Sequence, residues 1–417
     1  MTAQSFALLF AGFLLLGVLV RSLLMLRQIR HVGEFRHRVP PVFAHSISLE
    51  SHQRAADYTA ARMRLGIVDA VVGALLALAL TLGGGLQAIY DAWAAVFAAG
   101  GIAHGIALLA TLAVVSWLVE LPFGLYRTFV VEKRFGFNRM TPALFIADTA
   151  KGSVIATAVG LPVLAAVLWL MGAMGSYWWL WVWAVWLVFN LLVLLVWPTF
   201  IAPLFNKFTP LADEALKARV EALLARCGFQ SKGLFVMDGS KRSAHGNAYF
   251  TGFGASKRIV FFDTLLAKLE PAEVEAVLAH ELGHFRHRHI TKRLAVLAPG
   301  ALVLFALLGW LMQTPWFYAG LGMASGGTAV ALALFSLALP AFTFPLSPIA
   351  SHWSRLHEFE ADRYAASQTR ADDLVAALVK LYRDNAATLT PDPLYSRFFD
   401  SHPPAAIRIA RLQGLPA

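Results

Sequence analysis

The chain has 417 residues, of which 58% are hydrophobic and only 14% are charged. Soluble proteins average roughly 25% charged residues, so this composition excludes a chain built only of soluble domains and indicates an integral membrane protein. The formal net charge is +10, but the basic residues are not interleaved with aromatic ones, so we expect no nucleic acid partner. The single cysteine, Cys227, excludes a disulfide framework and a cysteine-type zinc site.

The membrane spans are predicted from stretches that contain no Asp, Glu, Lys or Arg. A spanning helix needs about 20 apolar residues. Three of the five uncharged stretches fit one crossing each, and two are long enough for two crossings, with breaks at 171–176 and 313–315. We therefore predict seven spans, near residues 4–25, 67–90, 96–120, 153–171, 177–199, 294–312 and 326–347.

The distribution of charge predicts the orientation in the membrane. With seven spans, the segments 21–69, 120–151, 207–293 and 355–417 lie on one side, and they contain all 35 Lys and Arg residues. The opposite side carries only Asp91. By the positive-inside rule the basic side is cytoplasmic. We expect a multi-pass protein whose partner is the lipid bilayer, in a bacterial inner membrane or, for a eukaryotic source, in the endoplasmic reticulum.

The chain then divides into four parts. Residues 1–206 hold five spans with cytoplasmic loops, and 294–354 hold spans six and seven. Residues 207–293 form a soluble segment, and 355–417 form a helical C-terminal segment. Within the soluble segment the patterns predict an amphipathic helix at 212–228, strands at 234–238, 247–253 and 258–263, and a helix at 271–289.

The HELGH sequence at 280–284 is typical of a zinc protease. On a helix, His280 and His284 lie one turn apart on the same face, so both imidazoles can bind one zinc ion. Glu281 can hold and deprotonate a water molecule. The alternative is an amphipathic cytoplasmic helix with surface histidines. We assign that surface role to the neighbouring His287 and His289.

A third zinc ligand has to come from elsewhere, because the longer HExxHxxGxxH pattern is absent. In SRLHEFEADRYAA, residues 354–366, Glu358 and Asp362 lie one helical turn apart. One carboxylate can bind zinc while the other supports a ligating imidazole, and Glu360 points into solvent. The alternative for Glu358 is an exposed acidic helix. The HELGH helix runs into span six and the Glu358 helix leaves span seven, which would bring Glu358 to the two histidines.

The sequence resembles the zinc-dependent CAAX prenyl proteases, a seven-spanning membrane family of gluzincin type. The order of the matching blocks is more specific than HELGH alone, although the first sixty-odd residues match only loosely. The blocks are LPFGLYRTFVVEKRFGFNRMT at 121–141, PTFIAPLFNKFTPL at 198–211, DGSKRSAHGNAYFTGF at 238–253, RIVFFDTLL at 258–266, HELGH at 280–284, EFEAD at 358–362 and SHPPAAIR at 401–408.

This resemblance implies a mainly α-helical fold, in which seven transmembrane helices surround a chamber and a cytoplasmic-side gluzincin domain contains a small β-sheet. It implies His280, His284 and Glu358 as ligands of one Zn²⁺ per chain, with Glu281 as general base. It further implies roles for Asp362 and Arg408 beside the ligands, for His402 in stabilising the oxyanion, and for Asn247, Ala248 and Tyr249 as a substrate-binding edge strand. The residues alone leave two alternatives open, namely that His402 caps a turn before Pro403 and that 247–249 is an ordinary half-buried strand.

The predicted function is that of an integral membrane zinc metalloendopeptidase. Zinc and Glu281 would activate a water molecule that hydrolyses a peptide bond. The resemblance implies protein substrates of the prenylated CaaX type, cleaved near their C-terminus. One alternative is a membrane quality-control zinc protease with no prenyl requirement. A more distant alternative is a transporter in which HExxH is incidental.

Overall fold

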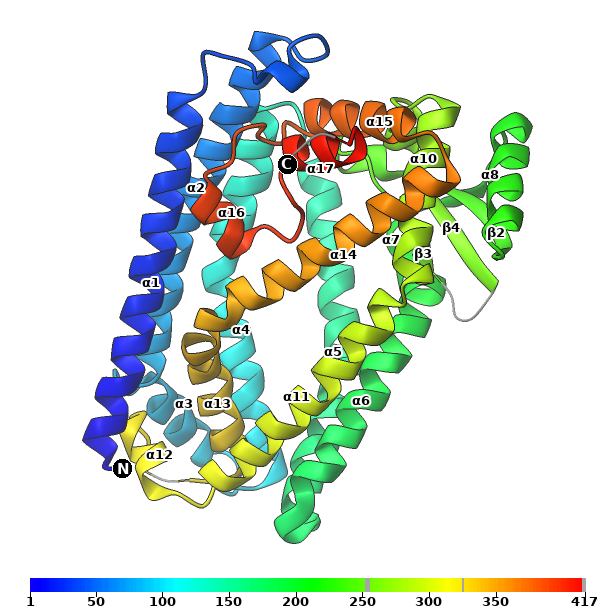
Figure 1. The fold of residues 1–417 in the computed structure, drawn as a ribbon. Coiled ribbons are helices and arrows are strands. Elements are labelled where there is room, and N and C mark those ends of the chain that lie inside the picture. Colours follow the sequence, from blue (N-terminus) through cyan, green and yellow to red (C-terminus); the bar gives the residue numbers. More distant parts are fainter. Residues whose placement is uncertain (252–255, 325, 415–417) are drawn as a thin grey trace.

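The computed structural model describes residues 1–251, 256–324 and 326–414 (Figure 1). Within them, seven helical stretches are long and apolar enough to cross a membrane, which confirms the predicted number of spans. They are Ala3–Glu34 (α1), Leu49–Leu80 (α2), Ile102–Glu132 (beginning with α4, Ile102–Tyr126), Pro142–Ala173 (α5), Gly175–Phe205 (including α6, Trp178–Val196, and α7, Ala202–Phe205), His289–Leu311 (α11) and Thr328–Gln368. The last stretch contains α13, Thr328–Thr343, and α14, Ser347–Gln368.

The boundary of the second span was predicted wrongly. We expected it near 67–90, whereas α2 begins at Leu49 and ends at Leu80. The helix begins earlier because the Ser48 side chain caps it and its charged first turns need not lie in the bilayer. It ends earlier because a glycine-rich turn follows, in which Gly84 adopts a left-handed conformation with φ of 77°. The uncharged stretch 70–90 therefore contains a helix end, a turn and part of another helix.

The two ends of the helical assembly differ in composition. At the end that carries the N-terminus, short helices α3 (Gly85–Ala94) and α12 (Pro315–Gly320) connect the spans (Figure 1). The opposite end carries the sheet and the C-terminal helices (Figure 1), which belong to segments that the sequence makes rich in Lys and Arg. This segregation agrees with the topology that the charge pattern predicts.

A small four-stranded sheet lies at the basic end. Its strands are β1 (Phe208–Pro210), β2 (Gln230–Met237), β3 (Ala248–Thr251) and β4 (Ser256–Phe262), in the order β1-β2-β4-β3. The central pair, β2 and β4, is parallel, and the two outer pairs are antiparallel. The prediction missed the three-residue β1, and residues 252 and 253 of the predicted second strand lie outside the described residues. Among the described strands, β3 is at an edge of the sheet, so one side of its backbone pairs with no other described strand.

The soluble core joins two segments that are far apart in the sequence. Helices α8 (Glu214–Arg226), α10 (Pro271–Arg286) and α15 (Ala371–Asp384) pack with the sheet around it. Leu278 and Leu282 of α10 are almost fully buried, as is Leu374 of α15. Short helices α9 (Asp263–Leu266), α16 (Pro393–Phe399) and α17 (Ala405–Leu412) complete this end. This packing fixes α10 against the C-terminal segment.

Candidate metal centre

Helix α10 carries HELGH and is fixed at both of its ends. At its start, Glu270 and Glu273 form a capping box around Pro271. At its end, Arg288 adopts a left-handed conformation with φ of 55°, and α11 begins at the next residue. The predicted continuous helix from HELGH into span six is therefore wrong, because this backbone turn separates the two helices and directs the start of α11 back towards the site.

Three side chains from two helices converge on one point. The Nε2 atoms of His280 and His284 on α10 lie 3.2 Å apart. Each lies 3.5 Å from a carboxylate oxygen of Glu358 on α14. Four tetrahedral ligands at 2.0–2.1 Å from a zinc ion are separated by about 3.3 Å, so the three residues fit this metal. Glu358 Oε2 is buried and has no hydrogen-bond partner among the described residues, and Arg408 Nη1 lies 3.7 Å from it, so this oxygen stays available to a bound cation.

Close packing of a glycine brings these helices together. An ideal Cβ built on Gly283 would lie 2.8 Å from Cα of Ala361 and 3.2 Å from Cβ of Tyr364. Only glycine lets α10 approach α14 so closely, which explains why the fourth position of HELGH is Gly in this chain. The approach places Glu358 opposite the two histidines.

Asp362 and Arg408 contact the candidate ligand His280. Asp362 Oδ1 lies 2.9 Å from Nδ1 of His280, so this nitrogen can donate to the carboxylate while Nε2 faces the metal position. Arg408 from α17 donates to both oxygens of Asp362, at 2.6 and 2.8 Å, and is itself buried. The structure thus brings together the two residues that the resemblance implied beside the ligands.

The surroundings shift the pKa values of the two histidines in opposite directions. Burial opposes the charging of His280, but its contacts with Asp362 and Glu358 raise its pKa to about 9. Burial and the neighbouring His280 lower the pKa of His284 to about 4, so His284 is neutral at pH 7. Burial also raises the pKa of the Glu281 carboxyl above its ordinary value, which suits a group that accepts and returns a proton.

His289 and Glu360 form a second supporting chain, which the sequence interpretation missed. The sequence pattern predicts His289 at the membrane surface and Glu360 in solvent, but His289 is buried and its Nδ1 lies 2.9 Å from Nδ1 of His284. Its Nε2 lies 2.8 Å from Oε2 of Glu360. His284 is thereby linked through an imidazole to a carboxylate. The turn at Arg288 creates this contact, and a helical-wheel projection of an unbroken helix cannot reveal it.

His402 lies at the rim of the ligand group. Its Nε2 is 3.4 Å from Oε1 of Glu358, and 61% of its side chain is exposed. The loop that carries it is held by Arg355 on α14, which donates to the backbone oxygens of Ser396 and Asp400 at 3.2 and 2.8 Å. His402 is therefore positioned beside the candidate metal ligands and faces open space.

The predicted substrate strand lies beside the ligands only in part. A cavity of about 330 Å³ is lined by Asn247 and Ala248 together with Glu281, Glu358 and other residues of the site. Tyr249 turns the other way and packs its ring edge-on against Phe262, as expected from the alternation of side chains along a strand. The structure thus brings the start of β3 to the candidate metal centre and directs Tyr249 away from it.

Comparison with known proteins gives concordant results. The family described as "CAAX prenyl protease N-terminal, five membrane helices" matches residues 28–207, and peptidase family M48 matches residues 210–415. CAAX prenyl protease 1 homolog of Arabidopsis thaliana is 33% identical over 97% of this chain and 96% of its own length. CAAX prenyl protease 1 of Saccharomyces cerevisiae is 33% identical over 97% and 94%. The crystal structure of S. mikatae Ste24p superposes with a TM-score of 0.90 at 32% identity, covering 98% of each chain.

Proposed function

Because the chain belongs to the CAAX prenyl protease family of M48 metallopeptidases, we propose that it binds one zinc ion through His280, His284 and Glu358 and hydrolyses peptide bonds near the C-terminus of prenylated CAAX-type proteins. The observation that carries the proposal is the convergence of the three side chains, whose ligand atoms all lie within 4.8 Å of one another. Glu281 lines the same cavity, so a general base is available where a substrate can enter.

Glu281 performs the proton transfer in this mechanism. A bound zinc ion would polarise the scissile carbonyl and acidify the attacking water. The Glu281 carboxylate takes a proton from that water and passes it to the leaving amine. The pKa of the Glu281 carboxyl is raised towards neutral pH, and a group whose pKa lies nearer the working pH both accepts and releases a proton readily.

His402 stabilises the negative charge that develops on the carbonyl oxygen. Its ring faces the open side of the ligand group, 3.4 Å from Glu358, where a donor can reach the reacting carbonyl. A donor in such a position typically contributes about 3 kcal/mol to the transition state. Asp362 and Arg408 keep His280 oriented, and they act through this ligand without touching the substrate.

The substrate is proposed to bind as an added strand along β3, beginning at Asn247 and Ala248. The free edge of β3 supplies the backbone groups for this pairing. The basic end of the protein, which contains the site, is proposed to face the cytoplasm, where the positive-inside rule places Lys and Arg.

The test uses the full-length protein purified in detergent and loaded with zinc. A farnesylated CAAX peptide and the same peptide with an unmodified cysteine are incubated separately, and the products are identified by mass spectrometry. We expect about one zinc per chain, cleavage of the farnesylated peptide, and slow cleavage of the control. Glu281→Gln should keep its zinc and lose turnover.

The outcomes separate the alternatives. Equal cleavage of both peptides would favour a quality-control protease without a prenyl requirement. Absence of zinc, or wild-type activity in the Glu281→Gln variant, would contradict the assigned site. A matched control is Glu221→Gln on the soluble helix α8, which should change neither zinc content nor rate.

A further inference from the structure

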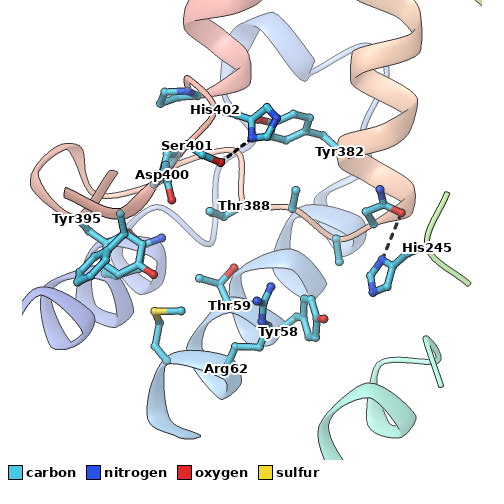
Figure 2. Close-up of a pocket in the computed structure, with 18 of the residues that line it drawn as sticks. Tyr58, Thr59, Arg62, His245, Tyr382, Thr388, Tyr395, Asp400, Ser401 and His402 are labelled. Atoms are coloured by element: carbon cyan, nitrogen blue, oxygen red, sulfur yellow. Dashed lines mark hydrogen bonds between the residues drawn. The ribbon is translucent and has the colours of Figure 1, made fainter. Parts of the chain in front are cut away.

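A second and larger cavity adjoins the cavity of the metal centre. It has a volume of about 770 Å³ and shares His402 and Asn385 with the smaller one. Figure 2 shows Tyr58, Thr59 and Arg62 of α2 on one side of it and His402 with Tyr382 on the other. Cavities of roughly 300–1,000 Å³ hold small ligands, so this space can accept a few residues of a peptide that passes His402.

The cavity presents two guanidinium groups and two carboxyl groups. Arg62 and Arg127 both line it, and neither forms an ion pair with a carboxylate of the described residues. Of the two acidic residues, Glu132 accepts from the Tyr58 hydroxyl and lies 3.4 Å from Nε2 of His245, and the nearby charge of Arg62 interacts with it electrostatically. A substrate carboxylate that enters the cavity can therefore meet a guanidinium that forms no ion pair with a carboxylate of the described residues.

The direction of the proposed substrate strand leads towards this cavity. A peptide paired antiparallel to β3 runs opposite to it, so its C-terminal half lies beside the residues that precede Ala248. Those residues are Asn247, Gly246 and His245, and His245 lines the large cavity. A substrate that runs along β3 in this direction would therefore pass the candidate metal centre first and would enter the large cavity with its C-terminal segment.

We propose that the large cavity receives the substrate residues beyond the scissile bond and that Arg62 pairs with the free carboxylate at the end of the chain. This inference rests on the proposed function. A CAAX sequence ends three residues after its cysteine, and three extended residues span about 10 Å. A substrate cleaved after the cysteine therefore presents its terminal carboxylate close to the active site, inside the adjoining space.

Arg62 is held in place for this role. Its guanidinium lies over the ring of Tyr58, 5.5 Å from the centroid, and the Tyr58 hydroxyl is fixed by Glu132. Arg62 also interacts electrostatically with Glu132 but forms no ion pair with it, so its planar guanidinium can still donate two parallel hydrogen bonds to one carboxylate. Arg62 is accordingly a specificity-determining residue, separate from the groups that activate water.

The test compares two farnesylated CAAX peptides that differ only in their terminus, a free acid and an amide. The full-length zinc-loaded protein is expected to cleave the acid with a kcat/KM about 10- to 100-fold higher, the range of a charge-assisted hydrogen bond. In Arg62→Gln the acid should lose this advantage, mainly through KM, whereas the amide should be unaffected. The control Arg64→Gln removes the same charge two residues further along α2, where the side chain lines a different cavity.

Equal rates for the acid and the amide in the wild type, or a preserved preference in Arg62→Gln, would overturn the inference. Loss of the preference in Arg127→Gln alone would overturn the assignment to Arg62. A second measurement does not depend on turnover. The free tripeptide and its amide are titrated into the full-length Glu281→Gln protein by calorimetry, and the acid should bind about 10- to 100-fold more tightly.

This second measurement separates the two hypotheses. If neither peptide is cleaved but the tripeptide acid still binds more tightly than its amide, and Arg62→Gln removes this difference, the proposed function fails and the carboxylate site stands. If cleavage requires farnesylation but the tripeptide acid and amide bind equally, the proposed function stands and the carboxylate site fails.

Discussion

Arg408 and Asp362 form a buried pair joined by two hydrogen bonds, from Nη2 to Oδ1 at 2.6 Å and from Nε to Oδ2 at 2.8 Å. The same carboxylate contacts Nδ1 of His280 at 2.9 Å. One aspartate therefore links the last helix of the chain to a candidate zinc ligand. The pair couples the folding of the C-terminal segment to the geometry of the metal centre.

Removal of Arg408 should destabilise the protein strongly. In Arg408→Met the Asp362 carboxylate stays buried without its cation, and breaking a buried pair in this way costs about 3–5 kcal/mol. The measurement is denaturant unfolding in detergent. The control is Arg411→Met on the same helix, which removes an exposed guanidinium over the Phe359 ring and should cost about 1 kcal/mol or less. Equal losses in the two variants would contradict a special role for the buried pair.

Gly283→Ala should disturb both stability and zinc binding. The added methyl group would press on the Ala361 backbone 2.8 Å away, and overpacking of this kind costs about 1–3 kcal/mol. Because the strain separates α10 from α14, zinc affinity should fall as well. Gly152→Ala on α5 is the matched control, since nothing lies within 4 Å of its ideal Cβ. Zinc titration and unfolding of both variants test this, and an unchanged Gly283→Ala protein would refute the close-packing argument.

His289 should influence zinc binding without touching the metal. Replacement of a group that orients a ligating histidine typically lowers metal affinity about 10- to 100-fold. We expect His289→Phe to show this loss in competition with a chromogenic chelator, because it removes the partner of His284 Nδ1. His287→Phe, which alters a neighbouring ring that stacks on His289, is the control. Wild-type zinc affinity in His289→Phe would show that the contact is without consequence.

Asp392 should contribute a distinct acid-sensitive part of the stability. Burial alone would raise its pKa, but the backbone N–H of Tyr395 and the guanidinium of Arg27 lower it below the ordinary value of 3.8. A carboxyl group whose pKa is lower in the folded than in the unfolded protein stabilises the fold at pH values above its unfolded-state pKa. This contribution is lost as the pH falls through its folded-state pKa.

Asp392→Asn should therefore be less stable than the wild type at pH 7, and the difference should shrink as the pH falls from about 5 to 2. Thermal unfolding of both proteins across this range measures it. A constant difference at every pH would show that the ionised carboxylate is not the source of the stabilisation.

The sequence was sufficient for the features that depend on local pattern. Uncharged stretches gave the number of spans, and the spacing of HELGH placed His280 and His284 on one helical face. The carboxylate Glu358 could be chosen because the charge pattern predicts that its helix lies on the same side of the membrane. These inferences need only helical periodicity and the preference of charge for water.

The rest depended on backbone geometry that no local pattern encodes. The contact of His289 with His284 requires the turn at Arg288, a residue type that rarely adopts a left-handed conformation. The approach of α10 to α14 at Gly283 is a tertiary contact across some eighty residues. The position of β3 at the sheet edge follows from the parallel pairing of β2 with β4, a long-range choice.

The division of the metal centre between α10 and α14 also sets the order in which it can be made. A nascent chain synthesised as far as α11 carries both histidines and Glu281 but no carboxylate ligand, which comes only with α14 after another span has formed. His402 and Arg408 follow still later in the sequence. The candidate metal centre can therefore be completed only after the seventh span has been synthesised, so a nascent chain that has not reached α14 does not carry the assembled set of candidate ligands.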